Sequence, residues 1–272
     1  SIKIDDKIII GTVMRNQPRK LFDKLFDAFS RFDKKHILYC HTTYPDAGWD
    51  LGELLIKHKI LNRVLFTYKC KVCNQSYASV FQDIRTFCPF CKEVACKMPD
   101  GQDAVDNKTL NKIINIFDVY VQLASREGFG IPQIEAAACD IPVVTVDYAG
   151  MSDIIKYLDA YPINKTNDYL SYPMNMIEAN PSIDDVVNTI KNAISDNLKG
   201  SGKFRKKYEE HYQSWDRTYQ TFKSIVDKLP IKKWQKEEIH APPEYSEIKI
   251  SNEDYAKFLM IYVLGRPDFV GS

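Results

Sequence analysis

The chain has 272 residues, a formal net charge of +1, 44% apolar residues and 27% charged residues. This length allows one large or two modest domains, and the apolar content is enough for a full hydrophobic core. The near-zero net charge excludes a global positive field that would attract nucleic acid or acidic membranes, and no apolar run approaches a membrane span.

The chain opens with a predicted strand, Lys7–Gly11, and a loop that carries Arg15, Arg19 and Lys20. Apolar residues then recur at helical spacing and predict one buried helix face, made of Leu21, Phe22, Leu25, Phe26, Phe29 and Phe32. A guanidinium can bind a diphosphate through two hydrogen bonds, and lysine adds a compact charge. Taken alone, however, these cations are better explained as solvated loop charges that contribute little to folding stability.

Strands and helices continue in alternation. Residues 36–41 predict a second strand, residues 51–58 a short helix, and residues 64–68 a third strand. His41 ends the second strand and could face a binding cleft. An isolated histidine of this kind more often has a structural role.

Two Cys-x-x-Cys pairs follow the third strand. Cys70 and Cys73 are separated from Cys88 and Cys91 by fourteen residues, which is the spacing of a zinc ribbon with four thiolate ligands. The alternatives are disulfides or a chance spacing, but the seven cysteines are an odd number and no signal peptide is visible. An oxidising compartment is therefore disfavoured, and a cytoplasmic protein is expected.

A metal site closed by four cysteines leaves no open position for catalysis, so the predicted Zn²⁺ is structural. A segment as short as 69–97 cannot build its own core, so the ion supplies its folding energy. Loss of a ligand should then unfold the ribbon but leave the main sheet intact. Because ligands bind beyond the carboxyl ends of parallel strands, we expect the ribbon at the rim of the binding cleft.

Residues 119–147 predict a strand, a glycine-rich turn, a helix and another strand. Gly128 and Gly130 allow a close ligand approach that a Cβ would prevent. Pro132 fits the first turn of a helix, whose N-terminal N–H groups and dipole suit a diphosphate. Asp140 fits a helix stop, since aspartate tolerates left-handed geometry.

Two carboxylates flank this glycine-rich turn. Glu127 stands at its mouth, and Glu135 lies about one turn inside the helix, where it could accept hydrogen bonds from ribose hydroxyls. The segment therefore predicts a binding site for phosphates and hydroxyls. The alternative is an ordinary strand, turn and helix with surface glutamates.

The rest of the chain predicts helices. Apolar positions at helical spacing lie in residues 110–117, in 183–194 after the cap Ser182, and in 204–226. Pro230 ends the last of these, and an apolar helix at 255–264 closes the chain.

Taken together, the two glycine-containing segments resemble the C-terminal half of retaining GT-B glycosyltransferases of the glycogen-synthase and sucrose-synthase kind. In that family an arginine and a lysine have four residues between them, as Arg15 and Lys20 do. Its second signature is two glutamates with seven residues between them, around a Gly-Phe-Gly turn, which Glu127 and Glu135 match.

The resemblance covers roughly residues 7–227 and has two departures. Asp140 stands where the family usually has glycine, and Asp153 where glutamate is common. Neither removes a group that the chemistry needs, but a role for position 153 is left in doubt.

The resemblance implies an α/β fold, a Rossmann-like parallel sheet with helices on both faces and a small inserted zinc ribbon. Residues 1–228 would form this nucleotide-sugar-binding domain, interrupted at 69–97, and residues 229–272 a helical tail. Only the donor half of a two-half enzyme is recognisable. We therefore expect a fragment, or a stand-alone half, that lacks an N-terminal half and transfers little sugar without it.

The resemblance also implies the reaction, which is glycosyl transfer from a nucleoside-diphosphate sugar with retention of configuration. Arg15 and Lys20 would take the leaving phosphates, Glu127 would hold sugar hydroxyls, and Glu135 would bind the ribose. The remaining donor-binding residues would be Gly11, Gly128, Phe129, Gly130 and Ile131. No Asp-x-Asp motif is present, so no catalytic divalent metal is expected.

The acceptor could be a glycan, a protein or a modified nucleic acid. A different class of function also stays open, namely a zinc-ribbon adaptor that binds nucleic acid. Its cations would be Lys69, Lys71, Arg85 and Lys92, and its stacking residues Tyr77, Phe81 and Phe90. These aromatic residues are better explained as the ribbon's own core, and a pure adaptor would not need the arginine, lysine and glutamate set.

Overall fold

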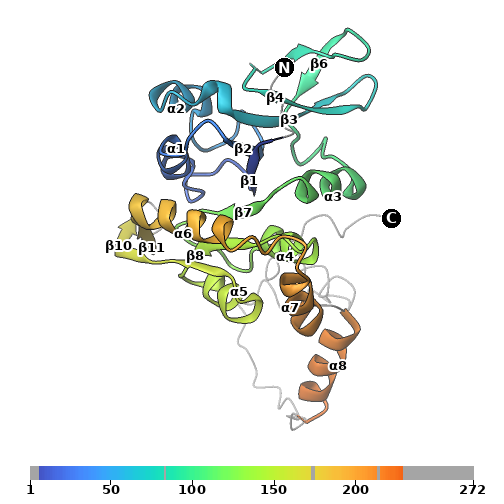
Figure 1. Cartoon of the computed structure of the whole chain (residues 1–272). Helices are drawn as coiled ribbons and strands as arrows, with labels where there is room; N and C mark the ends of the chain where they lie inside the picture. Colours follow the sequence, from blue (N-terminus) through green and yellow to red (C-terminus); the bar gives the residue numbers. More distant parts are fainter. Residues whose placement is uncertain (1–5, 83, 173–174, 213–214, 229–272) are drawn as a thin grey trace, which may run out of the picture. The chain divides into compact units, whose positions relative to one another are not determined.

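The computed structural model describes residues 6–82, 84–172, 175–212 and 215–228 (Figure 1). The chain divides into two compact units, residues 1–215 and 216–272. The predicted tail at 229–272, with its helix at 255–264, lies outside the described residues. Among those described, no helix combines the length and apolar character needed to cross a bilayer.

A nine-stranded sheet forms the centre of the first unit, in the order β5-β6-β3-β2-β1-β7-β8-β9, with β4 also paired to β3. In this spatial order, neighbouring strands from β3 through β2, β1, β7 and β8 to β9 are parallel. They are β1 (Ile8–Val13), β2 (His36–His41), β3 (Val64–Cys70), β7 (Val119–Gln122), β8 (Val143–Val146) and β9 (Tyr161–Ile163). The predicted Rossmann-like sheet is thus confirmed.

Helices cover both faces of the sheet, because its strands alternate apolar side chains between two cores. One core contains α1 (Phe22–Ser30), α2 (Leu51–Lys57) and α6 (Ile183–Ser195). The other contains α3 (Asn107–Asn115), α4 (Ile131–Ala138), most of α5 (Gly150–Leu158) and the start of α7 (Lys203–Tyr212). A short 3-10 turn, η1 (Leu61–Arg63), precedes β3.

The cysteine-containing insertion is part of the main sheet. Its strands are β4 (Ser76–Val80), β5 (Thr86–Phe87) and β6 (Val94–Lys97). β3 runs on to Cys70 and pairs antiparallel with β4 on one edge and with β6 on the other. The third strand was predicted to end at residue 68, whereas β3 continues to Cys70 and belongs to both the main sheet and the insertion.

One feature of the later chain differs from the sequence-based expectation. A hairpin of β10 (Lys165–Ser171) and β11 (Met176–Pro181) was not predicted. Residues 204–226 were predicted as one helix, and the described parts of this segment are helical, as α7 and α8 (Trp215–Val226). Phe204 of α7 is fully buried, whereas Tyr219 and Phe222 of α8 are exposed.

Asp140 follows the C-terminus of α4 and caps the N-terminus of α7. Its φ of 59° is left-handed, as predicted, and its buried carboxylate accepts hydrogen bonds from the backbone N–H groups of Gly202, Phe204 and Arg205. The aspartate at this position thus caps a helix that begins more than sixty residues later in the chain.

Replacing Asp140 with glycine should keep the left-handed turn but lower the free energy of unfolding by about 1–2 kcal/mol, because three N–H groups lose their acceptor. Chemical denaturation measures this. The matched control is Asp159→Gly, at an exposed left-handed position with φ of 55°, which should change stability less. Equal effects of the two variants would refute the capping role.

Candidate functional site

The loop after β1 is held against the loop after β2. The amide of the buried Asn16 donates to the Trp49 carbonyl at 2.8 Å and accepts from the Trp49 N–H at 2.9 Å. The Trp49 indole donates to the Lys20 carbonyl at 3.0 Å. These bonds fix the backbone that carries the predicted cations at the carboxyl end of β1.

A cluster of charges joins this loop to the end of β7. The Lys20 ammonium, only 6% exposed, forms an ion pair with Glu127 Oε2. The Arg19 guanidinium donates to the same oxygen at 3.1 Å, and the Gln122 amide at 3.4 Å. Within the described part of the chain, no donor reaches Glu127 Oε1, so this oxygen can accept from a ligand.

Burial and pairing act against each other in this cluster. Burial lowers the pKa of Lys20, although its bond to Glu127 opposes that shift. Burial raises the pKa of Glu127, but Lys20 and Arg19 outweigh burial and the net pKa is below the ordinary value. Glu127 is therefore ionised at neutral pH and bound by two cations.

The turn between Glu127 and α4 depends on its glycines. Gly130 has a φ of +82°, and a Cβ there would lie 2.1 Å from the Gln133 amide. Gly150 lets the next loop approach, since its N–H donates to the Glu127 carbonyl at 3.0 Å and a Cβ would lie 2.2 Å from the Gly128 carbonyl oxygen. These two glycines therefore allow the close packing of the turn that precedes α4 at Ile131.

The other predicted donor residues have different surroundings. Glu135 is half-buried within α4, and burial raises the pKa of its carboxyl group. Phe129 is exposed, with its ring centre 6.1 Å from that of Tyr212. Gly11 lies inside β1, where a Cβ would lie 2.1 Å from the Phe117 ring. The missing side chain of Gly11 therefore leaves room for the Phe117 ring to pack against β1.

Arg15 lies apart from the Lys20 pair. Its exposed guanidinium bonds Asp46 at 2.8 and 3.0 Å, which raises its pKa. It lines a pocket of about 420 Å³, the cleft pocket, together with His41 and the segment 99–104 that follows β6. That segment follows β6 of the insertion directly, but none of the pocket's lining residues lies within 69–97.

His41 lines the cleft pocket, and its side chain is fixed by a contact with Thr67. Its Nδ1 lies 2.9 Å from the Thr67 hydroxyl, and burial lowers its pKa to about 4. The imidazole is therefore neutral near pH 7, and Thr67 fixes its orientation.

Comparisons with known proteins agree with this architecture. Residues 103–215 match the family described as Glycosyl transferases group 1. Sucrose-phosphate synthase from Thermosynechococcus elongatus has a similar structure, with a TM-score of 0.55 and 16% identity. The chain has the Rossmann-like GT-B fold.

Two further GT-B structures are similar at low identity. Anabaena HepE in complex with UDP-glucose has a TM-score of 0.55 and 13% identity, and OtsA a TM-score of 0.52 and 14% identity. The three alignments cover 82–83% of this chain but only 45–50% of the other proteins, so the chain spans about half their length. No curated protein matches the sequence.

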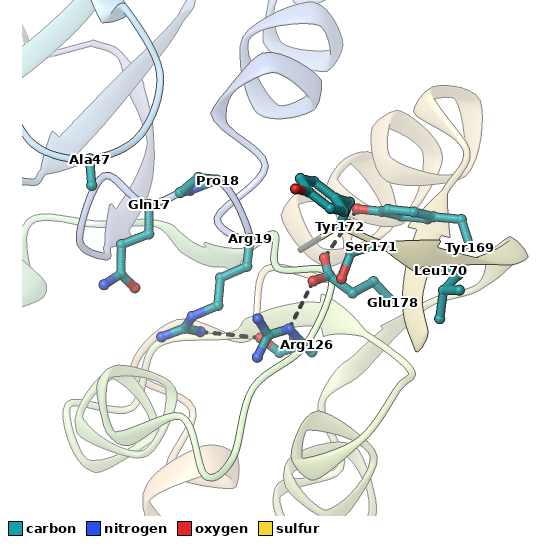
Figure 2. Close-up of a pocket in the computed structure, with 10 residues that line it drawn as sticks. All are labelled: Gln17, Pro18, Arg19, Ala47, Arg126, Tyr169, Leu170, Ser171, Tyr172 and Glu178. Atoms are coloured by element: carbon teal, nitrogen blue, oxygen red, sulfur yellow. Dashed lines mark hydrogen bonds and ion pairs between the residues drawn. The ribbon is translucent and has the colours of Figure 1, made fainter. Parts of the chain in front are cut away.

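A second pocket, about 510 Å³ in volume, was not predicted from the sequence (Figure 2). We call it the hairpin pocket. The loop after β1 forms one wall and the hairpin β10–β11 the other. It is lined by Gln17, Pro18, Arg19, Ala47, Arg126, Tyr169, Leu170, Ser171, Tyr172 and Glu178. Sequence patterns gave no signal for it, because its two walls are more than a hundred residues apart.

Glu178 anchors the hairpin to the loop before Glu127. Its buried carboxylate binds the Arg126 guanidinium at 2.9 Å, the Ser125 hydroxyl, and the Tyr169 hydroxyl at 3.1 Å. The Ala179 N–H also donates to the Ser125 carbonyl at 2.9 Å.

Acid should weaken this anchor. Burial raises the pKa of Glu178, but its bonds to Ser125 and Arg126 outweigh burial and bring the pKa to about 2, below the ordinary value of 4.5. A depressed pKa stabilises the fold above the unfolded value, so this contribution should be lost as pH falls from about 4.5 to about 2. Denaturant titrations across this range should show a shallower decline for Glu178→Gln than for the wild type, and parallel curves would contradict it.

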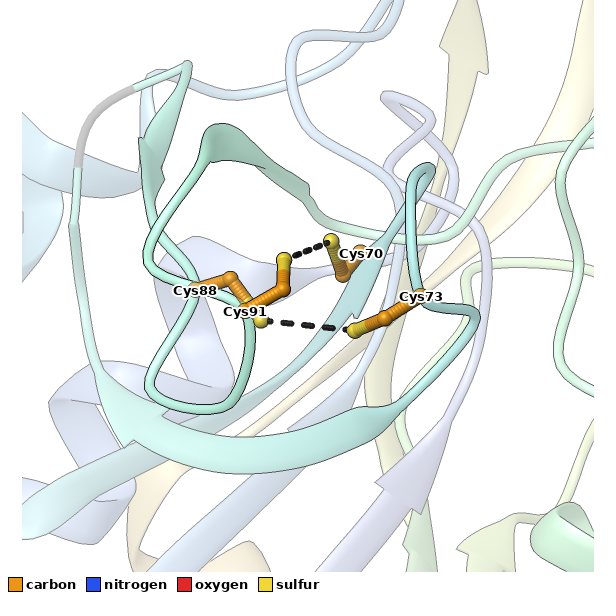
Figure 3. A group of neighbouring side chains, drawn as sticks. All are labelled: Cys70, Cys73, Cys88 and Cys91. Atoms are coloured by element: carbon orange, nitrogen blue, oxygen red, sulfur yellow. Dashed lines mark hydrogen bonds between the residues drawn. The ribbon is translucent and has the colours of Figure 1, made fainter.

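The four predicted metal ligands converge at the end of β3 (Figure 3). Their sulfur atoms all lie within 4.8 Å of one another, and Cys70–Cys91 and Cys73–Cys88 each approach to 3.6 Å. A tetrahedron of thiolates around Zn²⁺ has sulfurs about 3.8 Å apart, whereas a disulfide joins them at about 2 Å. The four sulfurs therefore fit a zinc site.

The ribbon side chains considered for nucleic-acid binding are largely engaged within the protein. Lys69 bonds Asp103 at 2.7 Å and the Ala104 carbonyl at 2.9 Å. Tyr77 stacks on Tyr68, and Phe81 packs edge-on against Phe66. Both partners belong to β3, so these rings pack on the core of the main sheet rather than forming a separate core of the ribbon. Phe90 is 54% exposed, but Tyr77, Phe81 and Phe90 do not form a row of exposed rings on which bases could stack.

Proposed function

We propose that this chain is the donor-binding half of a retaining glycosyltransferase that uses a nucleoside-diphosphate sugar. The observation that carries the proposal is the Lys20, Arg19 and Glu127 cluster, which places two cations and an available carboxylate oxygen beside a helix N-terminus. Such a site has groups for both phosphates and sugar hydroxyls.

The residues of the cluster and those around it have distinct tasks in this proposal. Arg15, Lys20 and the N–H groups of the turn 128–131 would stabilise the charge that develops on the leaving diphosphate. Oε1 of Glu127 would accept a hydrogen bond from a sugar hydroxyl, while Oε2 stays bound to Lys20 and Arg19. Glu135, deeper in α4, would bind the ribose.

The base would lie in the cleft pocket beside Arg15 and His41. Retention of configuration rests on the likeness of the arginine, lysine and two-glutamate pattern to the retaining enzymes. One solved neighbour, HepE, is in complex with UDP-glucose, which makes a uridine nucleotide the first candidate.

We also propose that Cys70, Cys73, Cys88 and Cys91 hold one structural Zn²⁺. The ion would tie the two Cys-x-x-Cys turns to the end of β3 and take no part in transfer, because four protein ligands close its coordination. The sulfur spacing supports this proposal.

Calorimetric titration of the full chain with UDP, GDP and ADP tests the donor site. One nucleotide should bind with a stoichiometry near one, and Glu135→Ala should weaken it, because the ribose loses an acceptor. Gln75→Ala, on the ribbon surface, is the control. Absence of binding by all three nucleotides would overturn the proposal.

A further inference from the structure

We propose that the hairpin pocket binds a neutral carbohydrate, which serves as the acceptor of the glycosyl group. The carbohydrate assignment stands on the pocket itself, and the acceptor role rests on the function proposed above. The pocket has a volume of about 510 Å³, enough for one or two sugar rings.

The position of the pocket places its contents next to the reacting groups. Arg19 lines it and donates from Nη1 to both Glu127 Oε2, at 3.1 Å, and the Arg126 carbonyl, at 3.2 Å. The turn 128–131, which would hold the donor, does not line it. The cleft pocket beside Arg15 shares none of its lining residues. A ligand here therefore adjoins the donor without occupying its place.

Ion pairs line the hairpin pocket. Arg126 is paired with Glu178 (Figure 2). Arg19 shares Glu127 with Lys20, so two cations face one carboxylate there. In the function proposed above, the diphosphate of the donor compensates this one excess positive charge. The paired guanidinium and carboxylate groups of the pocket then offer donors and acceptors to the hydroxyls of a neutral ligand.

Tyrosines supply the apolar part of the pocket. The Tyr169 hydroxyl is fixed by Glu178 at 3.1 Å, which holds its ring at the wall. Tyr172 is 94% exposed, so folding does not account for a large aromatic side chain at this place. The C–H face of a pyranose ring can cover such a tyrosine while its hydroxyls reach the charged pairs.

The test is saturation-transfer difference NMR on the full chain with lactose, cellotriose and maltotriose, and with 3′-sialyllactose as an anionic comparator. At least one neutral probe should give ring-proton signals with the wild type. Tyr172→Ala should weaken its binding about two- to tenfold, the range for one aromatic contact. Because the side chain is exposed, the melting midpoint of this variant should stay unchanged.

Tyr219→Ala, which removes an exposed tyrosine of α8, is the matched control and should bind as the wild type does. The carbohydrate assignment is overturned if no neutral probe gives a signal, if Tyr172→Ala binds them equally well, or if the sialylated probe is preferred. Nucleotide titration separates the two proposals. Carbohydrate binding without nucleotide binding would remove the acceptor role and the donor site together, while nucleotide binding without carbohydrate binding would refute this pocket alone.

Discussion

Replacing Lys20 with alanine is expected to lower both nucleotide affinity and folding stability, whereas replacing Arg15 should lower affinity alone. Each variant removes a charged donor to the diphosphate, which should weaken binding by about 1.5–3 kcal/mol. The effects on stability differ because Lys20 is 6% exposed and Arg15 is 64% exposed.

Loss of Lys20 removes one member of a buried ion pair. The expected decrease in the free energy of unfolding is about 3 kcal/mol, at the lower end for such a change, because Arg19 still binds Glu127. Loss of Arg15 breaks only an exposed pair with Asp46 and should cost less than about 1 kcal/mol. The sequence-based expectation that both are stability-neutral loop cations is thus corrected for Lys20.

Chemical denaturation and calorimetry with the best-binding nucleotide measure the two effects separately. Arg31→Ala, which breaks a surface pair with Asp184 at the far end of α1, is the control and should change neither. An unaltered denaturation midpoint for Lys20→Ala would contradict the buried pair. Unaltered affinity in both the Arg15 and Lys20 variants would show that the phosphates bind elsewhere.

Loss of the zinc site should disturb more than the ribbon. Cys70 ends β3, and Cys70, Cys88 and Cys96 are fully buried in the core that also contains Phe66 and Tyr68. Cys88→Ser should therefore unfold β4–β6 and expose the outer half of β3. The sequence-based prediction that the ribbon unfolds while the main sheet stays intact would hold only if the ribbon buried little of the shared core.

The disturbance should reach the cleft pocket. Lys69, adjacent to Cys70, bonds Asp103 and the Ala104 carbonyl, and Thr43 donates to the Pro99 carbonyl at 2.8 Å. These bonds hold the segment 99–104 that lines the pocket with Arg15 and His41. Zinc removal should thus raise hydrogen exchange at 98–104 and weaken nucleotide binding.

Elemental analysis should find about one zinc per chain in the wild type and in Cys139→Ser, whose half-buried thiol lies outside the cluster, but none in Cys88→Ser. Hydrogen exchange monitored by mass spectrometry gives the second readout. A zinc-free wild type would reject the metal. Unchanged exchange at 98–104 in Cys88→Ser would show that the ribbon does not support the pocket.

Local sequence signals were enough for the parallel sheet and for the glycine-rich turn. The apolar face of α1, the strand at 36–41 and the left-handed Asp140 depend on neighbours within a few residues, so their spacing predicted them. The four cysteines likewise follow a spacing rule, and their sulfurs do converge.

Tertiary structure alone decided which cations meet the glutamate. Arg15 and Lys20 have equal standing in the motif, but only Lys20 is buried against Glu127, and Arg19, outside the motif, joins it. The hairpin pocket is a contact between the loop at 17–19 and strands at 169–178. No periodicity or spacing encodes such a contact, because the packing of the intervening sheet sets which distant loops come together.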